Sequence, residues 1–172
     1  MNTTRKFAIQ LEEPWIWEGL EPPEDPIGEL SEWEMRLRRF CFECNHKVLI
    51  EIGDDKRYVF LDPDIIMILN ELPEKISKLS MGQKISIDFP ESWMIVDLMP
   101  VGSEISCTLR KFGDSCEHKH FELDKLQVLG VLRDFINKVM ELAMDKGYIR
   151  LEEKDEFLGT ALTSHASIVS PA

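Results

Sequence analysis

The sequence has few cysteines, and they follow no regular spacing. Four of its 172 residues are cysteine. Small extracellular domains that depend on disulfide bonds carry a much denser framework of cysteines. A chain of this length with 44% hydrophobic residues can bury a sizeable core without such crosslinks. We therefore expect reduced cysteines and a single domain.

The sequence also lacks a long hydrophobic run. Its apolar stretches fall well short of the ~20 residues that a membrane-spanning helix needs. The opening residues, MNTTRKFAIQ, do not show the charged, apolar and small-residue succession of a secretory signal peptide. We therefore expect a soluble cytoplasmic protein without a membrane partner.

Basic residues are scarce relative to acidic ones. The chain has 20 Lys and Arg against 32 Asp and Glu, which gives a formal net charge of -12. Proteins bind nucleic acids and anionic membranes largely through Lys and Arg, so this balance argues against both kinds of partner. Electrostatic attraction favours a basic protein as the partner instead.

Residues 84–147 predict a run of strands followed by a helix. Apolar and polar residues alternate over 85–89, 94–98 and 105–110, which is the period of strands with one face in solvent. A shorter strand is expected over 120–123. The helix that follows is predicted to begin at the cap residue Asp124 and to end at Gly147. Its apolar residues recur at the helical period, so the helix needs a sheet to lie on.

The first half of the chain repeats this plan in a looser form. Strands are predicted over 6–11, 35–44, 47–53 and 56–61. A helix should begin at Asp62, with proline in its first turn, and Pro73 predicts a kink or two short helices before Gly82. The result is an α+β fold of two four-stranded antiparallel sheets, each followed by a helix, in one domain over residues 1–150. Residues 151–172 lose the periodicity and are expected to form a loosely packed C-terminal extension or tail.

This β4αβ4α order resembles the whirly family over residues 6–147. The resemblance rests on the order of the elements and implies a fold that, in other proteins, binds single-stranded nucleic acid. Such binding uses a basic groove with interleaved aromatic side chains, which this sequence does not display. Nucleic-acid binding therefore remains an alternative function. Uncovered sheet edges also leave a homodimer open.

The most unusual stretch runs from Glu12 to Glu34, and we call it the acidic arm. It has nine acidic residues, no Lys or Arg, and the tryptophans Trp15, Trp17 and Trp33. Its prolines and glycines disfavour regular structure, so we predict a long surface loop over residues 12–34. One interpretation is a solvated loop whose tryptophans pack on the domain. The other is a docking surface, on which carboxylates attract a basic partner and tryptophans are the buried anchors.

The cysteines and histidines offer a competing interpretation. Cys41 and Cys44 have the C-x-x-C spacing, and Cys116, His118 and His120 could add ligands for zinc. In the predicted strand, however, the first two cysteines face opposite sides, and a small apolar role suits them better. The two later histidines could act as an acid and base pair, but the sequence shows no phosphate-binding loop or nucleophile motif. We therefore predict no enzymatic activity, cofactor or metal.

A small, acidic α+β chain without a catalytic motif is similar to the immunity proteins of bacterial contact-dependent growth inhibition. The resemblance implies a cognate toxin as partner, often a basic nuclease domain, whose active site is blocked by carboxylates that stand in for phosphates. These proteins share no motif, so the resemblance transfers no residue. Charge and aromatic content alone select the predicted partner-binding residues, which are Glu12, Glu13, Trp15, Trp17, Glu18, Glu21, Glu24, Asp25, and Asp54 and Asp55 at a hairpin tip.

Overall fold

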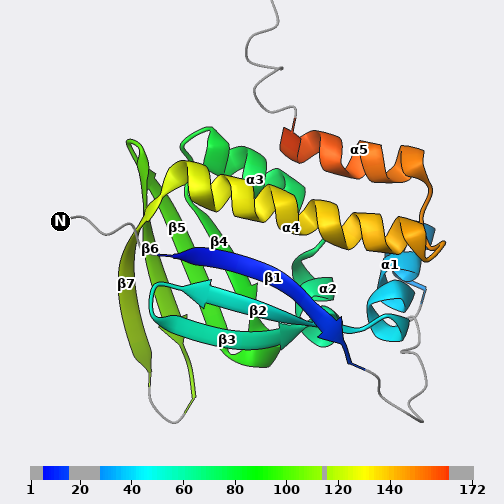
Figure 1. Ribbon diagram of the computed structural model, residues 1–172, viewed down its shortest axis with the longest axis horizontal. Helices are drawn as coiled ribbons and strands as arrows, with labels where there is room; N and C mark the ends of the chain where they lie inside the picture. Colours follow the sequence, from blue (N-terminus) through cyan, green and yellow to red (C-terminus); the bar gives the residue numbers. More distant parts are fainter. Residues whose placement is uncertain (1–5, 16–27, 114–115, 163–172) are drawn as a thin grey trace, which may run out of the picture.

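The computed structural model describes residues 6–15, 28–113 and 116–162. Within these ranges the protein has two antiparallel sheets, of three and four strands, and five α-helices (Figure 1). Side chains from both sheets and from the helices form one continuous buried core. The α+β class expected from the sequence is therefore confirmed.

Sheet A consists of β1 (Phe7–Pro14), β2 (His46–Ile52) and β3 (Asp55–Phe60), in the order β1-β2-β3. The register places Ile9 opposite Ile50 and Val48 opposite Val59. Residues directly opposite each other point to the same side of a sheet, so these apolar side chains share the inner face. The strands predicted over 6–11, 47–53 and 56–61 are confirmed, with small shifts at their ends. Because β1 continues to Pro14, the loop predicted over 12–34 does not begin at Glu12.

Sheet B is a meander of β4 (Ile85–Phe89), β5 (Met94–Val101), β6 (Glu104–Lys111) and β7 (Glu117–Asp124). Buried apolar side chains alternate with more exposed ones along β4, the first half of β5, β6 and the second half of β7. Strand β7 is longer than the expected segment 120–123, because its first half pairs with the end of β6 through residues such as Lys119 opposite Leu109.

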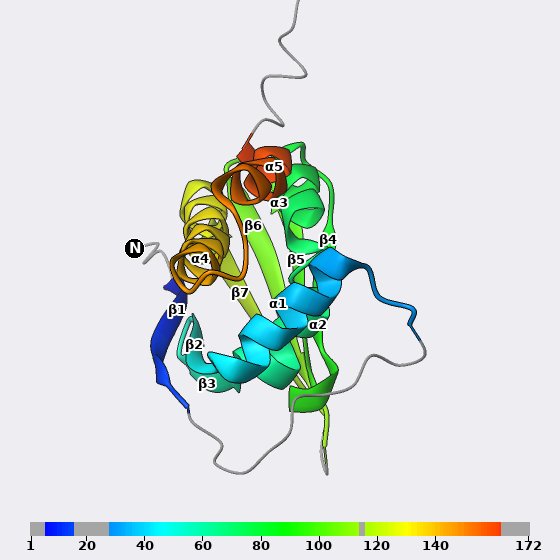
Figure 2. The same ribbon diagram turned by 90° about the vertical axis from the view of Figure 1, so that its right-hand side faces the viewer.

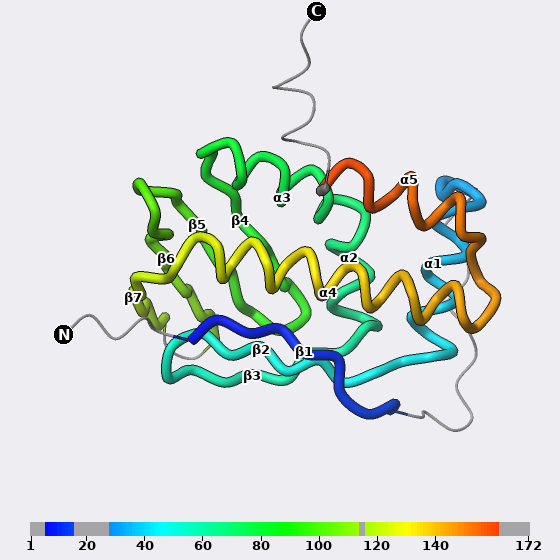
Figure 3. Tube along the Cα trace, turned by 45° about the horizontal axis from the view of Figure 1, so that its top comes forward, coloured from blue at the N-terminus to red at the C-terminus, as the bar shows by residue number. Residues whose placement is uncertain are grey.

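The long helix α4 (Lys125–Asp145) begins where the sequence predicts. The side chain of Asp124 accepts a hydrogen bond of 2.9 Å from the backbone N–H of Gln127, which is the N-cap interaction. Gly147 follows the last turn with a φ of 84°, the left-handed conformation that ends many helices. The helix lies along the edge strand β1 and contacts β6 and β7, so it joins the two sheets (Figure 3).

Residues 35–44 are helical, and the strand predicted there is wrong. Helix α1 (Glu32–Glu43) begins at the N-cap Ser31, whose hydroxyl accepts from the backbone N–H of Glu34 and donates to its carboxylate. The bond from the Glu34 N–H is the N-cap interaction, and the pair lies just upstream of the predicted strand 35–44. The buried side chains of Leu37 and Phe40 follow the helical period. Because this segment is helical, sheet A has three strands in the described residues, and the first four-stranded sheet of the predicted order is not formed.

The segment after β3 is a series of short helical turns. A single wide turn over Leu61–Ile65 leads into α2 (Ile66–Ile68), and α3 (Leu72–Ser80) follows with Pro73 in its first turn. The expected interruption near Pro73 is confirmed. Asp62, however, is not the predicted N-cap, since its backbone is extended with φ -120° and ψ 121°. Its backbone N–H and C=O both pair with the buried side chain of Asn45, at 3.1 and 2.9 Å.

Residues 151–162 form helix α5 (Leu151–Leu162), so the prediction of a loose extension does not hold for them. Leu158 and Ala161 are buried, and the helix packs on α3 and α4. The first two turns of this helix are mostly charged, and its apolar face is narrow. The rest of the predicted tail, residues 163–172, lies outside the described residues.

The helices group on two sides of the sheets. Helices α3, α4 and α5 pack on one another above the sheets, while α1 and α2 lie together at one end (Figure 2). Among the described residues, no helix is both long and apolar enough to span a bilayer.

A buried carboxylate holds the two sheets together. Asp55, at the start of β3, forms ion pairs with Lys111 on β6 at 2.6 Å and with Lys119 on the neighbouring β7 at 3.1 Å. Its side chain is 6% exposed, and burial alone would raise its pKa. The hydrogen bonds and charges of the two lysines outweigh burial, so the pKa of Asp55 is lowered overall. The ionised carboxylate therefore stabilises the contact between sheet A and sheet B.

The tip of the same hairpin packs closely on sheet B. Gly53 has a φ of 60°, which favours glycine, and a Cβ atom built there would lie 2.3 Å from the ring of Phe121 on β7. The turn thus needs glycine for its conformation and for the close approach of the two sheets.

Replacing Asp55 with alanine should lower the free energy of unfolding by about 2 kcal/mol at neutral pH, because two lysines lose their buried carboxylate. The stabilisation by a carboxylate with a lowered pKa is present above its unfolded-state pKa, about 3.9, and is lost as the pH falls through the folded-state value. Urea unfolding should therefore show a difference between the two proteins that narrows below about pH 4. The exposed neighbour supplies the control, since Asp54→Ala should change stability by under about 0.5 kcal/mol. Equal losses in both variants would refute the assigned role of Asp55.

Candidate functional site

The structure does not bring the predicted partner-binding residues together. Glu12, Glu13 and Trp15 lie at the end of β1, next to the start of β2. Asp54 lies at the opposite end of sheet A, in the exposed turn beside Asp55, whose carboxylate is already held by two lysines. Asp54 and Asp55 at the hairpin tip therefore do not form one negative surface with Glu12 and Glu13. The other predicted contacts, Trp17, Glu18, Glu21, Glu24 and Asp25, lie outside the described residues.

Trp15 belongs to an aromatic cluster on the outer face of sheet A. Its ring centroid lies 5.8 Å from that of Phe60, and its backbone N–H donates to the carbonyl of Asn45 at 2.7 Å. The ammonium of Lys47 lies 5.9 Å from the Trp15 ring and 4.9 Å from the Tyr58 ring. This cluster fits the interpretation in which a tryptophan of the acidic arm packs on the domain. Trp15 and Tyr58 are still 41% and 53% exposed.

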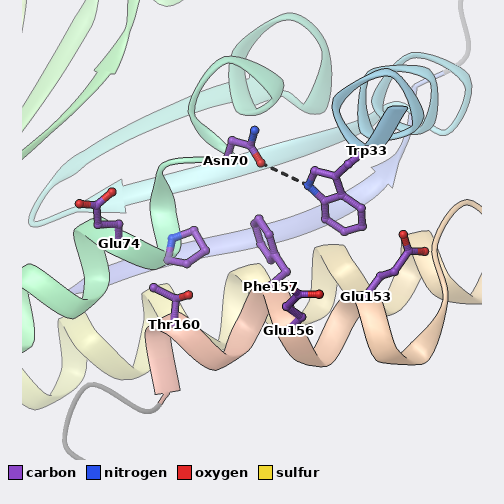
Figure 4. A pocket seen from close by; sticks show the side chains of 8 residues that line it. Trp33, Asn70, Glu74, Glu153, Glu156, Phe157 and Thr160 are labelled. Carbon is purple, nitrogen blue, oxygen red and sulfur yellow. Dashed lines mark hydrogen bonds between the residues drawn. The ribbon is translucent and has the colours of Figure 1, made fainter. Parts of the chain in front are cut away.

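A third tryptophan of the acidic arm, Trp33, contributes to a groove between α1, α3 and α5 (Figure 4). The groove has a volume of about 520 Å³ and an acidic rim, and we call it the acidic groove. Its lining residues come from three distant parts of the sequence and are Trp33, Asn70, Pro73, Glu74, Glu153, Glu156, Phe157 and Thr160.

The floor of the acidic groove is aromatic. The ring centroids of Trp33 and Phe157 are 5.8 Å apart, and the indole N–H donates to the side-chain oxygen of Asn70 at 3.3 Å. The guanidinium carbon of Arg36 lies 5.7 Å from the Trp33 ring. These contacts fix the indole between two helices and leave an aromatic surface facing the groove.

One carboxylate of the rim is part of the scaffold. Arg36 of α1 forms a two-pronged pair with Glu153 of α5, at 2.8 and 2.5 Å, and also donates to the carbonyl of Tyr148 at 3.2 Å. Glu153 accepts a further bond from the backbone N–H of Arg150. The hydrogen bonds from Arg36 and Arg150 lower the pKa of Glu153 to about 2. This pair docks α5 on α1 and so forms one wall of the groove.

The remaining rim carboxylates have little compensation. Glu74 pairs with Lys78 at 3.4 Å, in an exposed contact one turn away on the same helix. Glu156 is exposed and forms no ion pair with the parts of the chain that the structure describes. Exposed pairs of this kind contribute little, so the rim keeps a net negative charge.

Aromatic rings below a carboxylate rim are suited to a Lys or Arg side chain. The aliphatic stem can lie on the rings while the cation faces a carboxylate, and an arginine can also stack on the indole. The groove lining presents the carboxylates of Glu74, Glu153 and Glu156 to such a cation.

The candidate zinc ligands lie in two separate places. Cys41 and Cys44 are at the end of α1, whereas Cys116, His118 and His120 are in or beside β7, at the opposite end of the molecule (Figure 1). The described residues contain no group of three or more His, Cys, Asp or Glu that could hold a metal ion. Burial raises the pKa of the Cys41 thiol, so it is a poor nucleophile and metal ligand.

A serine, a histidine and a glutamate also meet on the outer face of sheet B. Nε2 of His120 lies 3.3 Å from Oγ of Ser106 and 2.7 Å from Oε1 of Glu122. A proton relay needs the base to contact the nucleophile through one ring nitrogen and the acid through the other. Here both contacts use the same nitrogen, so the arrangement does not form a catalytic triad.

Sequence reasoning placed Trp33 in the acidic arm without selecting it as a partner-binding residue, and it missed the rest of the acidic groove. Glu153, Glu156 and Phe157 lie in the segment expected to be a tail, and Asn70 lies at the break between two helices. The spacing of Phe157, Leu158 and Ala161 is the sequence signal that could have revealed an amphipathic helix there.

The Glu153→Gln variant should loosen α5 from α1, because a neutral amide cannot replace the charged two-pronged pair with Arg36. Amide hydrogen exchange at neutral pH should become faster in α5 and in the first turns of α1, and should change little in the centre of α4. The control is Glu152→Gln on the exposed face of α5, which should leave exchange unchanged. The pair stabilises the protein above the ordinary glutamate pKa of 4.5 and loses this effect as the pH falls toward about 2, so in urea unfolding the two proteins should converge in acid. Unchanged exchange in α5 would contradict this role.

Comparison with known proteins gives no match to a protein-family model, a curated protein or a solved structure. The function of this chain is therefore inferred from the chemistry of its own surface.

Proposed function

We propose that this chain is a non-enzymatic binding protein that neutralises a basic protein partner, as immunity proteins neutralise toxins. The observation that carries the proposal is the acidic groove, in which Trp33 and Phe157 form an aromatic floor beneath the uncompensated carboxylate of Glu156. A Lys or Arg side chain of the partner fits this combination of rings and charge.

The charge around the groove supports a basic partner. On one side, Glu29 precedes α1 and Glu32 is its first residue. On the other side, Glu152 and Asp155 lie on α5. Together with the net charge of -12, these residues produce a negative potential that attracts a basic surface from a distance. The aromatic floor would then contribute the short-range binding energy.

Inhibition by occlusion follows from the chemistry of a nuclease partner. The active site of a nuclease presents Lys and Arg to phosphate groups, and a rim of carboxylates can occupy those positions. The acidic arm leads directly into α1 and ends in the residues that build the groove. The arm residues predicted from the sequence, among them Glu12, Glu13 and Trp15, are therefore proposed as further contacts of the same partner.

The test is co-expression with the C-terminal region encoded by the reading frame immediately upstream. We expect that region to kill cells when expressed alone, to be tolerated with this chain, and to co-purify with it in a complex that weakens as salt increases. Glu156→Lys should reduce the affinity about tenfold or more, because it places a like charge opposite the partner's cation.

The matched control is Glu141→Lys, which makes the same charge change on the exposed side of α4, away from the groove lining. It should retain most of the affinity. Equal losses in the two variants would show that overall charge, and not the groove, determines binding. If the upstream product neither harms cells nor binds, the immunity function is wrong.

A second function, binding of single-stranded nucleic acid, is favoured by the exposed aromatic cluster on sheet A. Trp15 and Tyr58 flank Lys47 on a sheet face, and stacking on such side chains is how single strands are bound. Sheet B followed by α4 also matches the second half of the whirly order. The carboxylate of Glu12 in the same sheet opposes a phosphate backbone.

We expect an immobilised single-stranded oligonucleotide not to retain the protein at low salt, where such binding is strongest. Retention that disappears in the Tyr58→Ala variant would support the second function instead, and Tyr58 is exposed enough for this variant to fold.

A further inference from the structure

A second groove lies on the other side of the first turns of α1. It runs between α1 and the residues from Asp62 to Glu71, and its volume is about 600 Å³. The apolar residues of its lining that keep exposed surface are Leu30, Pro63, Ile66 and Met67, so we call it the apolar groove. Met67 is 56% exposed, although a side chain of this kind is usually buried.

The apolar groove and the acidic groove share a wall. Asn70 lines both of them, and its side chain accepts the hydrogen bond from the indole of Trp33. A partner segment whose cation lies over Trp33 would therefore need to cross only the hydrogen-bonded side chains of Trp33 and Asn70 to reach the apolar groove.

The charge at the apolar groove has the same sign as that at the acidic groove. Glu34, Asp62 and Glu71 line it together with Arg38, and Glu71 also pairs with Lys75 at 3.2 Å. Burial raises the pKa of Asp62, and the charge of Arg38 acts in the opposite direction. The lining therefore suits an aliphatic side chain that belongs to a basic segment.

We infer that the apolar groove receives a large aliphatic side chain from the same partner segment that places its Lys or Arg in the acidic groove. This inference rests on the proposed function and adds the chemistry of the partner's contact segment, which would carry one basic and one aliphatic residue. Two adjacent anchors on one segment would give specificity as well as affinity, because the separation between them must match the separation of the grooves.

Other occupants fit the charges less well. A second copy of this chain would bring a further net charge of -12 to an acidic surface, and like charges across an interface oppose association. A small apolar molecule would gain nothing from the neighbouring carboxylates.

The test uses blocked peptides of Gly and Ser that carry one Arg and one Leu at different separations. Matching peptides carry Ala in place of Leu, and others carry Gln in place of Arg. At the best separation, Leu should improve the affinity about tenfold over Ala, as expected for burial of one aliphatic side chain. The gain should vanish in Met67→Ser and persist in the control Met99→Ser, which changes a methionine on sheet B that is 45% exposed, against 56% for Met67.

The outcomes separate this inference from the proposed function. An Arg preference that is lost in Glu156→Lys, without any gain from Leu, would overturn the inference and leave the proposed function intact. A gain from Leu that survives in Met67→Ser would also overturn it. Concentration-dependent dimerisation that Met67→Ser abolishes would assign the groove to a second copy. Peptides with Gln that bind as well as those with Arg would overturn both proposals.

Discussion

Burial of one face of α4 is the constraint on which the rest of the structure depends. Eight of its side chains are buried, Val128, Leu129, Leu132, Phe135, Ile136, Val139, Met140 and Ala143. The helix contacts β1 of sheet A, β6 and β7 of sheet B, and both α3 and α5. Each large aliphatic side chain removed from water contributes roughly 1.5–3 kcal/mol, so this face holds the two sheets in one core. Of the helices that line the acidic groove, α3 and α5 are placed because they stack on α4.

The excess of acidic residues imposes a second constraint, which the interior satisfies locally. Glu51 pairs with Lys6 at 3.1 Å, and Asp55 pairs with two lysines. Asp64, which is 2% exposed, accepts hydrogen bonds from the backbone N–H of Phe60 and the hydroxyl of Ser92. Buried acids are tolerated because partners of this kind replace the lost hydration. The uncompensated charge therefore lies on the surface, where it affects the choice of partner more than the fold.

The fold could be predicted from the sequence wherever a segment showed only one hydrophobic periodicity, that of a strand or that of a helix. Sheet B and α4 alternate polar and apolar residues in a single clear pattern, so their positions follow from sequence. The segment from Met35 to Cys44 fits a strand and a helix about equally well, and what decides for the helix is the capping pair of Ser31 and Glu34 upstream. Helix α5 was missed because its charged residues outnumber the two that are buried, Leu158 and Ala161.

The acidic groove could not be predicted as a unit, because its residues come from three helices that only tertiary packing brings together. Sequence could single out Trp33 by its acidic surroundings, but not Phe157, which meets it across the groove. The same packing also decides which carboxylates can bind a partner. Glu153 and Glu156 are three residues apart and share one side of α5. The first is held by Arg36 and docks the helix, whereas the second stands at the rim without a cation among the described residues. The ion pair of Arg36 with Glu153 thus stabilises the fold, and Glu156, on the same side of α5, remains available to bind a partner.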